Sequence, residues 1–199
     1  YAKCGDFNKA WEVHEDFCIQ NVASWSALIS GYQQHGQADL ALTCFEQMQD
    51  EGLSPDAITF ICALKACSAL GDTSKGLHLH NEVSLLALET ELPVANSLID
   101  MYARCGYLGE AQAVFGNMSV RDEVSWTTLI AGYAEDGNGE EALRCFNQMQ
   151  MCGFIPDAVT YVCVLRSCAH IGAIDKAQEI HADIEKQRLV ETNVVVGNT

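Results

Sequence analysis

The most constraining feature of this chain is an internal repeat. The block formed by residues 22–56 recurs as residues 123–157, at an offset of 101 residues. Aligned without a gap, the two copies share 17 identical residues. Repeats with periods of this length are typical of solenoids, in which neighbouring units share one continuous core. The repeat therefore predicts a stack of similar units, although a chain of 199 residues would otherwise suit one or two conventional domains.

Each copy contains two apolar stripes with helical spacing. The first stripe has the spacing i, i+3, i+4, i+7 and the second has i, i+4, i+7. Gly36 separates the stripes, and the turn Ser54-Pro55-Asp56 follows the second. Each unit is therefore predicted to be a hairpin of two helices that cannot bury its apolar face alone. In residues 22–56 the stripes are Trp25, Leu28, Ile29 and Tyr32, then Ala41, Phe45 and Met48.

The rest of the chain continues the same register with two further kinds of unit. Residues 57–91 have Gly71 at the break between helices, and residues 158–193 repeat this second kind. A third kind, residues 92–122, is shorter. We predict an all-α, right-handed α-solenoid of helix-turn-helix repeats, with about six hairpins, over residues 1–199. Because both ends of the chain lie inside units, we expect a fragment of a longer protein. The units are 1–21 (partial), 22–56, 57–91, 92–122, 123–157, 158–193 and 194–199 (partial).

The cysteines follow the repeat rather than a disulfide or zinc framework. There are ten, and no Cys-x-x-Cys pair occurs. Eight of them form pairs at the offset of 101 residues, mostly on apolar helix faces. We therefore expect reduced, buried cysteines that pack as small apolar residues. The recurring pairs are Cys4 and Cys105, Cys44 and Cys145, Cys62 and Cys163, and Cys67 and Cys168.

The charge of the chain argues against extensive phosphate neutralisation. The formal net charge is −16 at pH 7, whereas nucleic-acid binders gain much of their affinity from neutralised phosphates. The acid is concentrated in the second halves of the units and in the turns. In the first-helix segments of the five readable units, three cations balance three carboxylates. These segments are 22–34, 57–69, 92–104, 123–135 and 158–170, and their charged residues are Lys65, Arg104 and Arg166 with Asp100, Glu123 and Glu135.

No motif for catalysis, a cofactor or a metal stands out. His78 and His80 are two residues apart on a predicted helix, so they face different sides and cannot hold one metal. His80 recurs as His181 at the same repeat position, which favours packing. Asn117-Met118-Ser119 fits a glycosylation acceptor, but nothing else in the chain indicates secretion. No apolar run approaches the ~20 residues of a membrane span. We therefore expect no enzyme, no cofactor, no metal and no membrane partner.

The order of units resembles one known family. A cycle of two longer units and one shorter unit is similar to plant-type pentatricopeptide repeat proteins, which alternate P, L and S repeats. On this resemblance residues 22–56 and 123–157 are P-type, 57–91 and 158–193 are L-type, and 92–122 is S-type. The match covers the whole chain in register. The segments that carry it are Val124-Ser125-Trp126 through Gly132-Tyr133 (P), Gly76-Leu77-His78-Leu79-His80 (L) and Leu98-Ile99-Asp100-Met101-Tyr102-Ala103-Arg104-Cys105-Gly106 (S).

The resemblance implies binding of single-stranded RNA, with one base per repeat. In the family's scheme the fifth residue of a repeat and its last residue contact the base edge, and the second residue packs against the base face. The Ser or Thr with Asp pairing implies guanine, and Asn with Asp implies uracil. The base-edge residues would be Ser26 with Asp56, Asn96 with Asp122, Thr127 with Asp157, and Asn198 of the last partial unit; the packing residues would be Ala23, Ile58, Pro93, Val124 and Val159.

These assignments agree with the chemistry of the side chains, but an alternative explains the same residues. A carboxylate accepts from the N–H groups of guanine, and an amide both donates and accepts, as uracil does. Residues at helix starts and after proline are, however, also common caps and turn residues. The L-type units have Ile61 and Val162 at the fifth position, which cannot hydrogen-bond, so we expect spacers. The last residues of these units are Glu91 and, at the expected boundary, Asn193.

Together these features predict a sequence-selective RNA-binding module with the pattern G-x-U-G-x. By resemblance, the full protein would act in mitochondria or chloroplasts, in RNA processing or cytidine-to-uridine editing, with other organellar proteins as further partners. The alternative is a protein–protein interaction scaffold, which the charge of −16 favours. An enzyme is the third candidate.

Overall fold

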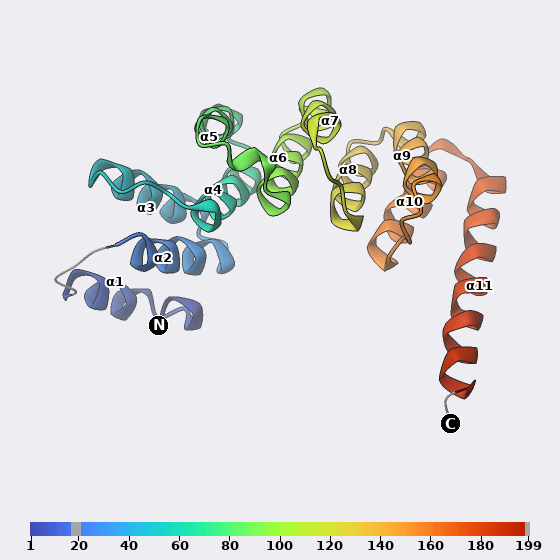
Figure 1. The fold of residues 1–199 in the computed structure, drawn as a ribbon, viewed down its shortest axis with the longest axis horizontal. Coiled ribbons are helices and arrows are strands. Elements are labelled where there is room, and N and C mark those ends of the chain that lie inside the picture. The colour runs from blue at the N-terminus through green and yellow to red at the C-terminus, as the bar shows by residue number, and fades with distance from the viewer. Residues whose placement is uncertain (17–20, 198–199) are drawn as a thin grey trace. The chain divides into compact units, whose positions relative to one another are not determined.

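The computed structural model describes the backbone of residues 1–16 and 21–197 and the side chains of residues 1–15 and 21–186. Within these ranges every regular element is a helix (Figure 1). The helices are η1 (Ala2–Cys4), α1 (Phe7–Asp16), α2 (Val22–Gln34), α3 (Ala38–Asp50), α4 (Ala57–Leu70), α5 (Thr73–Leu85), η2 (Leu88–Thr90), α6 (Leu92–Arg104), α7 (Leu108–Asn117), α8 (Glu123–Glu135), α9 (Gly139–Met151), α10 (Ala158–Ile171) and α11 (Ile174–Gly197).

The helices pair as the apolar stripes predict. Helix α2 contacts α3, α4 contacts α5, and α6 contacts α7, so each of these three units forms a hairpin. The first helices of successive units also touch, because α4 contacts both α2 and α6. Since each hairpin has an apolar face that only its neighbour can cover, this stacking gives the shared core that the repeat requires.

The predicted stripe residues lie in the core. Trp25 is 2% exposed and Trp126 is 5% exposed. The indole Nε1 of Trp25 donates to Glu51 Oε2 at 3.0 Å, so its polar end is also satisfied. The remaining members of the two stripes in residues 22–56 are all buried: Leu28, Ile29, Tyr32, Ala41, Phe45 and Met48.

Glycines occupy several helix ends and several close approaches between elements. Gly71 and Gly172, 101 residues apart, end α4 and α10 with φ of 67° and 70°, a left-handed conformation that glycine adopts without strain. Gly31 lies inside α2, where a Cβ would come within 2.6 Å of the Cβ of Ala2. The absence of a side chain at residue 31 therefore lets η1 pack directly on α2.

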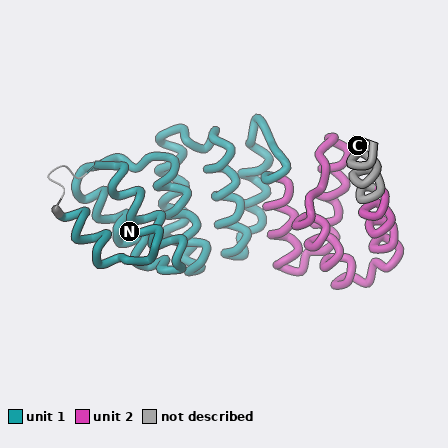
Figure 2. Tube along the Cα trace, turned by 90° about the horizontal axis from the view of Figure 1, so that it is seen from below, with its two compact units in different colours: residues 1–125 teal, residues 126–199 magenta. Residues whose placement is uncertain are grey.

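The chain divides into two compact units, residues 1–125 and residues 126–199 (Figure 2). The first contains the hairpins α2–α3, α4–α5 and α6–α7, and the second contains α9, α10 and α11 together with most of α8. Each unit has buried aromatic residues of its own, such as Phe60 in the first and Phe146 in the second. The hairpins are thus packed within both units.

One helix is longer than the repeat pattern predicts. Helix α11 is continuous from Ile174 to Gly197. It therefore crosses the boundary expected between residues 193 and 194, where no helix end occurs. No helix among the described residues is both long and apolar enough to cross a membrane.

Candidate functional site

The fifth residues of three units lie in the second turn of their first helices. Ser26 is on α2, Asn96 on α6 and Thr127 on α8. The last residue of each unit immediately precedes the next first helix, so Asp56 lies before α4 and Asp157 before α10. Because neighbouring first helices stack side by side, the fifth residue of one unit comes close to the start of the next unit.

The first such cluster joins Ser26, Asp56 and Thr59. The hydroxyls of Ser26 and Thr59 lie 2.6 Å apart, and Thr59 Oγ1 donates to Asp56 Oδ1 at 2.6 Å. The direct approach of Ser26 Oγ to Asp56 Oδ1 is longer, at 3.4 Å. Ser26 Oγ also lies 2.7 Å from the carbonyl oxygen of Val22, which is an alternative acceptor for its single proton, and Ser26 is only 8% exposed. The fifth and last residues of this unit are therefore connected mainly through Thr59.

The second cluster repeats this arrangement at the repeat offset. Thr127 Oγ1 lies 2.7 Å from Thr160 Oγ1, which donates to Asp157 Oδ1 at 2.7 Å. Thr160 is fully buried, as is Thr59, whereas Thr127 is half-buried. The same geometry thus occurs once in each compact unit.

The third cluster contains Asn96, Asp122 and Ser125. Asn96 Nδ2 donates to Asp122 Oδ1 at 3.4 Å, and the backbone N–H and hydroxyl of Ser125 donate to the same oxygen at 2.8 Å each. Burial is the largest single influence on the Asp122 carboxyl and acts to raise its pKa, but the hydrogen bonds from Ser125 and Asn96 together hold the pKa below its ordinary value. Asp122 therefore stays ionised.

An unpaired acceptor distinguishes this third cluster. The amide oxygen of Asn96 is enclosed and accepts no hydrogen bond from any described residue. A buried acceptor left without a partner costs about 1–3 kcal/mol. The unit of residues 92–122 therefore contains a polar atom whose hydrogen-bonding capacity the fold does not use.

The capping interpretation holds for the aspartates but not for the fifth residues. Asp56 accepts the N–H of Thr59, and Asp157 accepts the N–H of Thr160, both at 2.8 Å. These are N-cap bonds of α4 and α10. Helix α2 is capped by Asn21 instead, so Ser26 makes its contacts from inside the helix. In the capping clusters around Asp56, Asp122 and Asp157, the hydrogen bonds from described residues all reach Oδ1, which leaves Oδ2 able to accept.

The second residues of the units are on the surface. Ile58 is 60% exposed, and Val124 and Val159 are each 56% exposed. Side chains with this exposure lie outside the buried core. The full set of predicted packing residues is exposed: Ala23, Ile58, Pro93, Val124 and Val159.

The units of residues 57–91 and 158–193 have aliphatic residues at the fifth position. Val162 is 64% exposed and Ile61 is half-buried, and neither side chain can hydrogen-bond. Glu91 is exposed and makes no side-chain cap to α6. Asn198 lies outside the described residues, and the side chain of Asn193 is likewise outside them.

The third residue of the next unit also belongs to each cluster, a role that we did not predict. Thr59, Ser125 and Thr160 each bridge or anchor the aspartate three positions before them. The signal was present, because Asp56-x-x-Thr59 and Asp157-x-x-Thr160 recur at the offset of 101 residues. A hydroxyl three residues after a capping aspartate is a recognisable helix-start pattern.

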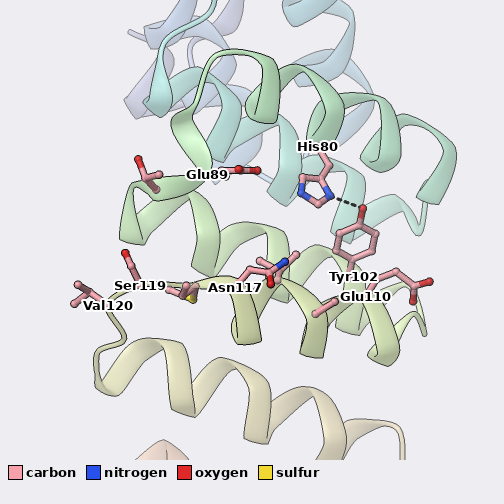
Figure 3. Close-up of a pocket in the computed structure, with 11 residues that line it drawn as sticks. His80, Glu89, Tyr102, Glu110, Asn117, Ser119 and Val120 are labelled. Carbon is pink, nitrogen blue, oxygen red and sulfur yellow. Dashed lines mark hydrogen bonds between the residues drawn. The ribbon is translucent and has the colours of Figure 1, made fainter.

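A separate pocket lies away from these clusters, among α5, η2, α6 and α7 (Figure 3). It measures about 320 Å³, and His80 Nδ1 lies 2.7 Å from the hydroxyl of Tyr102 at its wall. Desolvation lowers the pKa of His80, so the ring is neutral near pH 7. His78 instead pairs with Glu82 at 2.9 Å. The two histidines thus have separate packing partners, and no group of three metal-ligating side chains occurs among the described residues.

Repeated helix hairpins with a shared core define a helical-repeat protein. Family models narrow this class: the PPR repeat family model matches residues 20–69 and 121–170, and a PPR repeat model matches residues 94–122 and 159–189. These matches cover most of the chain. The chain therefore belongs to the pentatricopeptide repeat family.

Related sequences agree with this assignment. A pentatricopeptide repeat-containing protein of Arabidopsis thaliana is 38% identical over 90% of this chain and 23% of its own length. A mitochondrial member from the same plant is 33% identical over 100% of this chain and 34% of its own length. The chloroplastic member DOT4 is 39% identical over 87% of this chain and 20% of its own length. The chain thus spans about a fifth to a third of these relatives.

Solved structures have the same fold. The crystal structure of the pentatricopeptide repeat protein PPR10 from maize matches 94% of this chain and 28% of its own, with a TM-score of 0.70 and 23% identity. PPR10 in complex with an 18-nucleotide psaJ RNA element matches 95% of this chain and 29% of its own, with a TM-score of 0.79 and 26% identity. The predicted fold class, an all-α solenoid of helical hairpins, is confirmed.

Proposed function

We propose that this chain binds single-stranded RNA sequence-selectively, and that each P-type or S-type unit recognises one base. The observation that carries the proposal is the recurrence of one polar geometry. Ser26 with Asp56 and Thr127 with Asp157 are each linked through a buried threonine hydroxyl at 2.6–2.7 Å. Core packing alone does not require such a polar link at the same place in both repeats.

The chemistry of each cluster supports a particular base. In the clusters of Asp56 and Asp157 the carboxylate has Oδ2 available to accept, and guanine offers the N1–H and N2–H groups that a carboxylate binds. In the third cluster the unused amide oxygen of Asn96 would accept the N3–H of uracil after a side-chain rotation. The exposed aliphatic second residues, such as Val124 and Val159, offer surfaces for stacking against bases.

The relatives support the same function and a place for it. PPR10 was crystallised with an RNA element, and relatives are named mitochondrial and chloroplastic. We therefore place the full protein in an organelle, acting in RNA processing or editing. The repeats themselves would bind RNA without catalysing a reaction. The P, L and S assignments of the units, and the base-recognition residues, belong to this proposal.

Competition binding tests the proposal. A single-stranded RNA with an unstructured flank on each side of G-x-U-G-x should bind better than RNAs in which G, U and G are replaced one at a time. Changes at either x should have little effect, because the L-type units contact no base edge. A protein–protein scaffold, which the charge of −16 also suits, would show no sequence-dependent RNA affinity at any salt concentration, and that result would reject the proposal.

A further inference from the structure

The first helices of the L-type units carry a matched pair of cations. Lys65 on α4 and Arg166 on α10 are 101 residues apart, so they occupy the same repeat position, the ninth. Both side chains are exposed. The units of residues 22–56, 92–122 and 123–157 have no cation there, because their ninth residues are Ser30, Asp100 and Ala131.

Both cations lack a charged partner, unlike most of the other cations whose side chains the structure describes. Neither Lys65 nor Arg166 forms an ion pair or a side-chain hydrogen bond with a described residue. By contrast, Lys75 pairs with Glu46 at 2.7 Å, and Arg104 pairs with Asp100 at 2.9 Å. Several other cations are similarly engaged: Arg121 with the carbonyls of Phe115 and Gly116, Arg144 with Glu141, Lys176 with Glu179, and Lys186 with Asp183.

The cations also share a face with the exposed aliphatic residues. On α4, residues 58, 61 and 65 have the spacing i, i+3, i+7, which places them on one side of a helix. Ile58 is 60% exposed and Ile61 half-buried. On α10 the same spacing relates Val159, Val162 and Arg166, and both valines are more than half exposed. The ninth residue thus follows the second and fifth residues along the same surface.

We infer that Lys65 and Arg166 are phosphate-binding residues, and that the L-type units hold the RNA backbone where they do not read a base. This inference rests on the proposed function. An RNA strand that passes the second and fifth residues of each unit must also pass the ninth, and its phosphates are the groups that an unpaired ammonium or guanidinium binds. In a chain with a net charge of −16, two unpaired cations at equivalent positions are a localised source of attraction.

Removing these cations should change how RNA affinity depends on salt concentration. Each phosphate neutralised on a single strand contributes about 0.7 to the slope of log affinity against log salt concentration. Lys65→Gln and Arg166→Gln should therefore each lower the slope by about 0.7, and the double variant by about 1.4. At 0.1 M salt a slope change of about 0.7 corresponds to about a fivefold change in affinity. Each single variant should therefore bind RNA about fivefold more weakly at that salt concentration. Because phosphates carry no sequence information, the loss should be equal for matched and mismatched RNAs.

The experiment measures binding of G-x-U-G-x RNA by fluorescence anisotropy between 25 and 300 mM salt. Lys75→Gln is the matched control, because it removes the same charge from a side chain already paired with Glu46 on the second-helix side. It should leave the slope unchanged. If the wild-type chain binds RNA and the slopes of the Lys65 and Arg166 variants equal its own, the inference is wrong while the proposed function stands. If Lys75→Gln lowers the slope as much as Lys65→Gln does, the effect is one of net charge, and the inference is again wrong.

Discussion

Thr127 Oγ1 lies 2.7 Å from Thr160 Oγ1, although the two threonines belong to different units of the repeat. The contact reproduces the one between Ser26 and Thr59, at 2.6 Å. Both link the second turn of one first helix to the capped start of the next. The stacking of first helices thus brings the fifth residue of a unit towards the carboxylate that ends the same unit, with the threonine of the next unit between them.

Replacing Thr127 by asparagine should change base preference at one nucleotide. The new amide would face Asp157 as Asn96 faces Asp122, and it would both donate and accept. A lost or mispaired hydrogen bond at a partly buried edge is worth about 1–3 kcal/mol. Preference at the fourth base of G-x-U-G-x should therefore move from guanine towards uracil by roughly tenfold, measured by competition binding. Val162→Asn, in an L-type unit, should shift preference much less; a folded Thr127 variant with unchanged preference would contradict the assignment.

Removing the hydroxyl of Thr160 should weaken both the fold and base selectivity. Thr160→Val keeps the shape of the side chain but removes its bonds to Asp157 and Thr127. Because the site is fully buried, we expect a loss of about 1–3 kcal/mol in the free energy of unfolding. Thr43→Val is the control, since its exposed hydroxyl bonds only to the carbonyl of Asp39 in the same helix. Equal unfolding free energies for the two variants in urea would show that the bridge is unimportant.

Truncating Trp126 should open a cavity at a buried site. The side chain is 5% exposed, and replacing a buried tryptophan with alanine costs about 3–5 kcal/mol. Because repeats couple chiefly to their neighbours, the melting transition of Trp126→Ala should broaden as well as shift. Met151→Ala, at a side chain that is 86% exposed, should melt as the wild-type chain does. A wild-type-like melt of the Trp126 variant would argue against the stacking described here.

Acid should destabilise the wild-type chain partly through Asp122. Its pKa is lower in the folded chain than the ordinary value of 3.8. The stabilisation it provides is therefore complete above about pH 4 and is lost as the pH falls through the lower, folded pKa. Asp122→Asn should remove this component, so its unfolding free energy should depend less steeply on pH below 4. Asp50→Asn, at an exposed carboxylate, should retain the wild-type slope, and an equal slope for the Asp122 variant would refute the prediction.

The cysteines should differ sharply in reactivity. Burial raises the pKa of Cys67 to about 12 and that of Cys44 to about 11, so little thiolate forms near pH 8. Cys4 and Cys152 are exposed. Brief treatment with iodoacetamide, followed by peptide mapping, should find Cys4 and Cys152 modified well before Cys44 and Cys67. Denaturation should remove the difference; equally rapid labelling of Cys67 in the folded chain would mean that its hairpin opens readily.

The environment of the cysteines could be predicted from their positions in the repeat. The recurrence of cysteines at the repeat offset predicted reduced, packed side chains, and the nine cysteines that the structure describes are free. Most of them are buried, among them Cys44, Cys62 and Cys168. Position within a repeat was thus enough to assign their environment, because every copy of a unit packs against the same kind of neighbour.

The repeat pattern by itself determined the helix hairpins, their register and their buried stripes. These properties depend on spacing within one or two helical turns, where side chains three or four residues apart share a face. The resemblance to the family selected the fifth and last residues, and the structure brings them close together in residues 22–56, 92–122 and 123–157.

Only the tertiary structure decided how those residues are connected. The bridging roles of Thr59 and Thr160 and the unpaired amide oxygen of Asn96 depend on how neighbouring helices pack. The continuity of α11 past residue 193 is likewise absent from the repeat pattern. Local spacing fixes which face a residue occupies. The partners that it finds there depend on how closely neighbouring helices pack, and side chains from the adjacent unit set that distance.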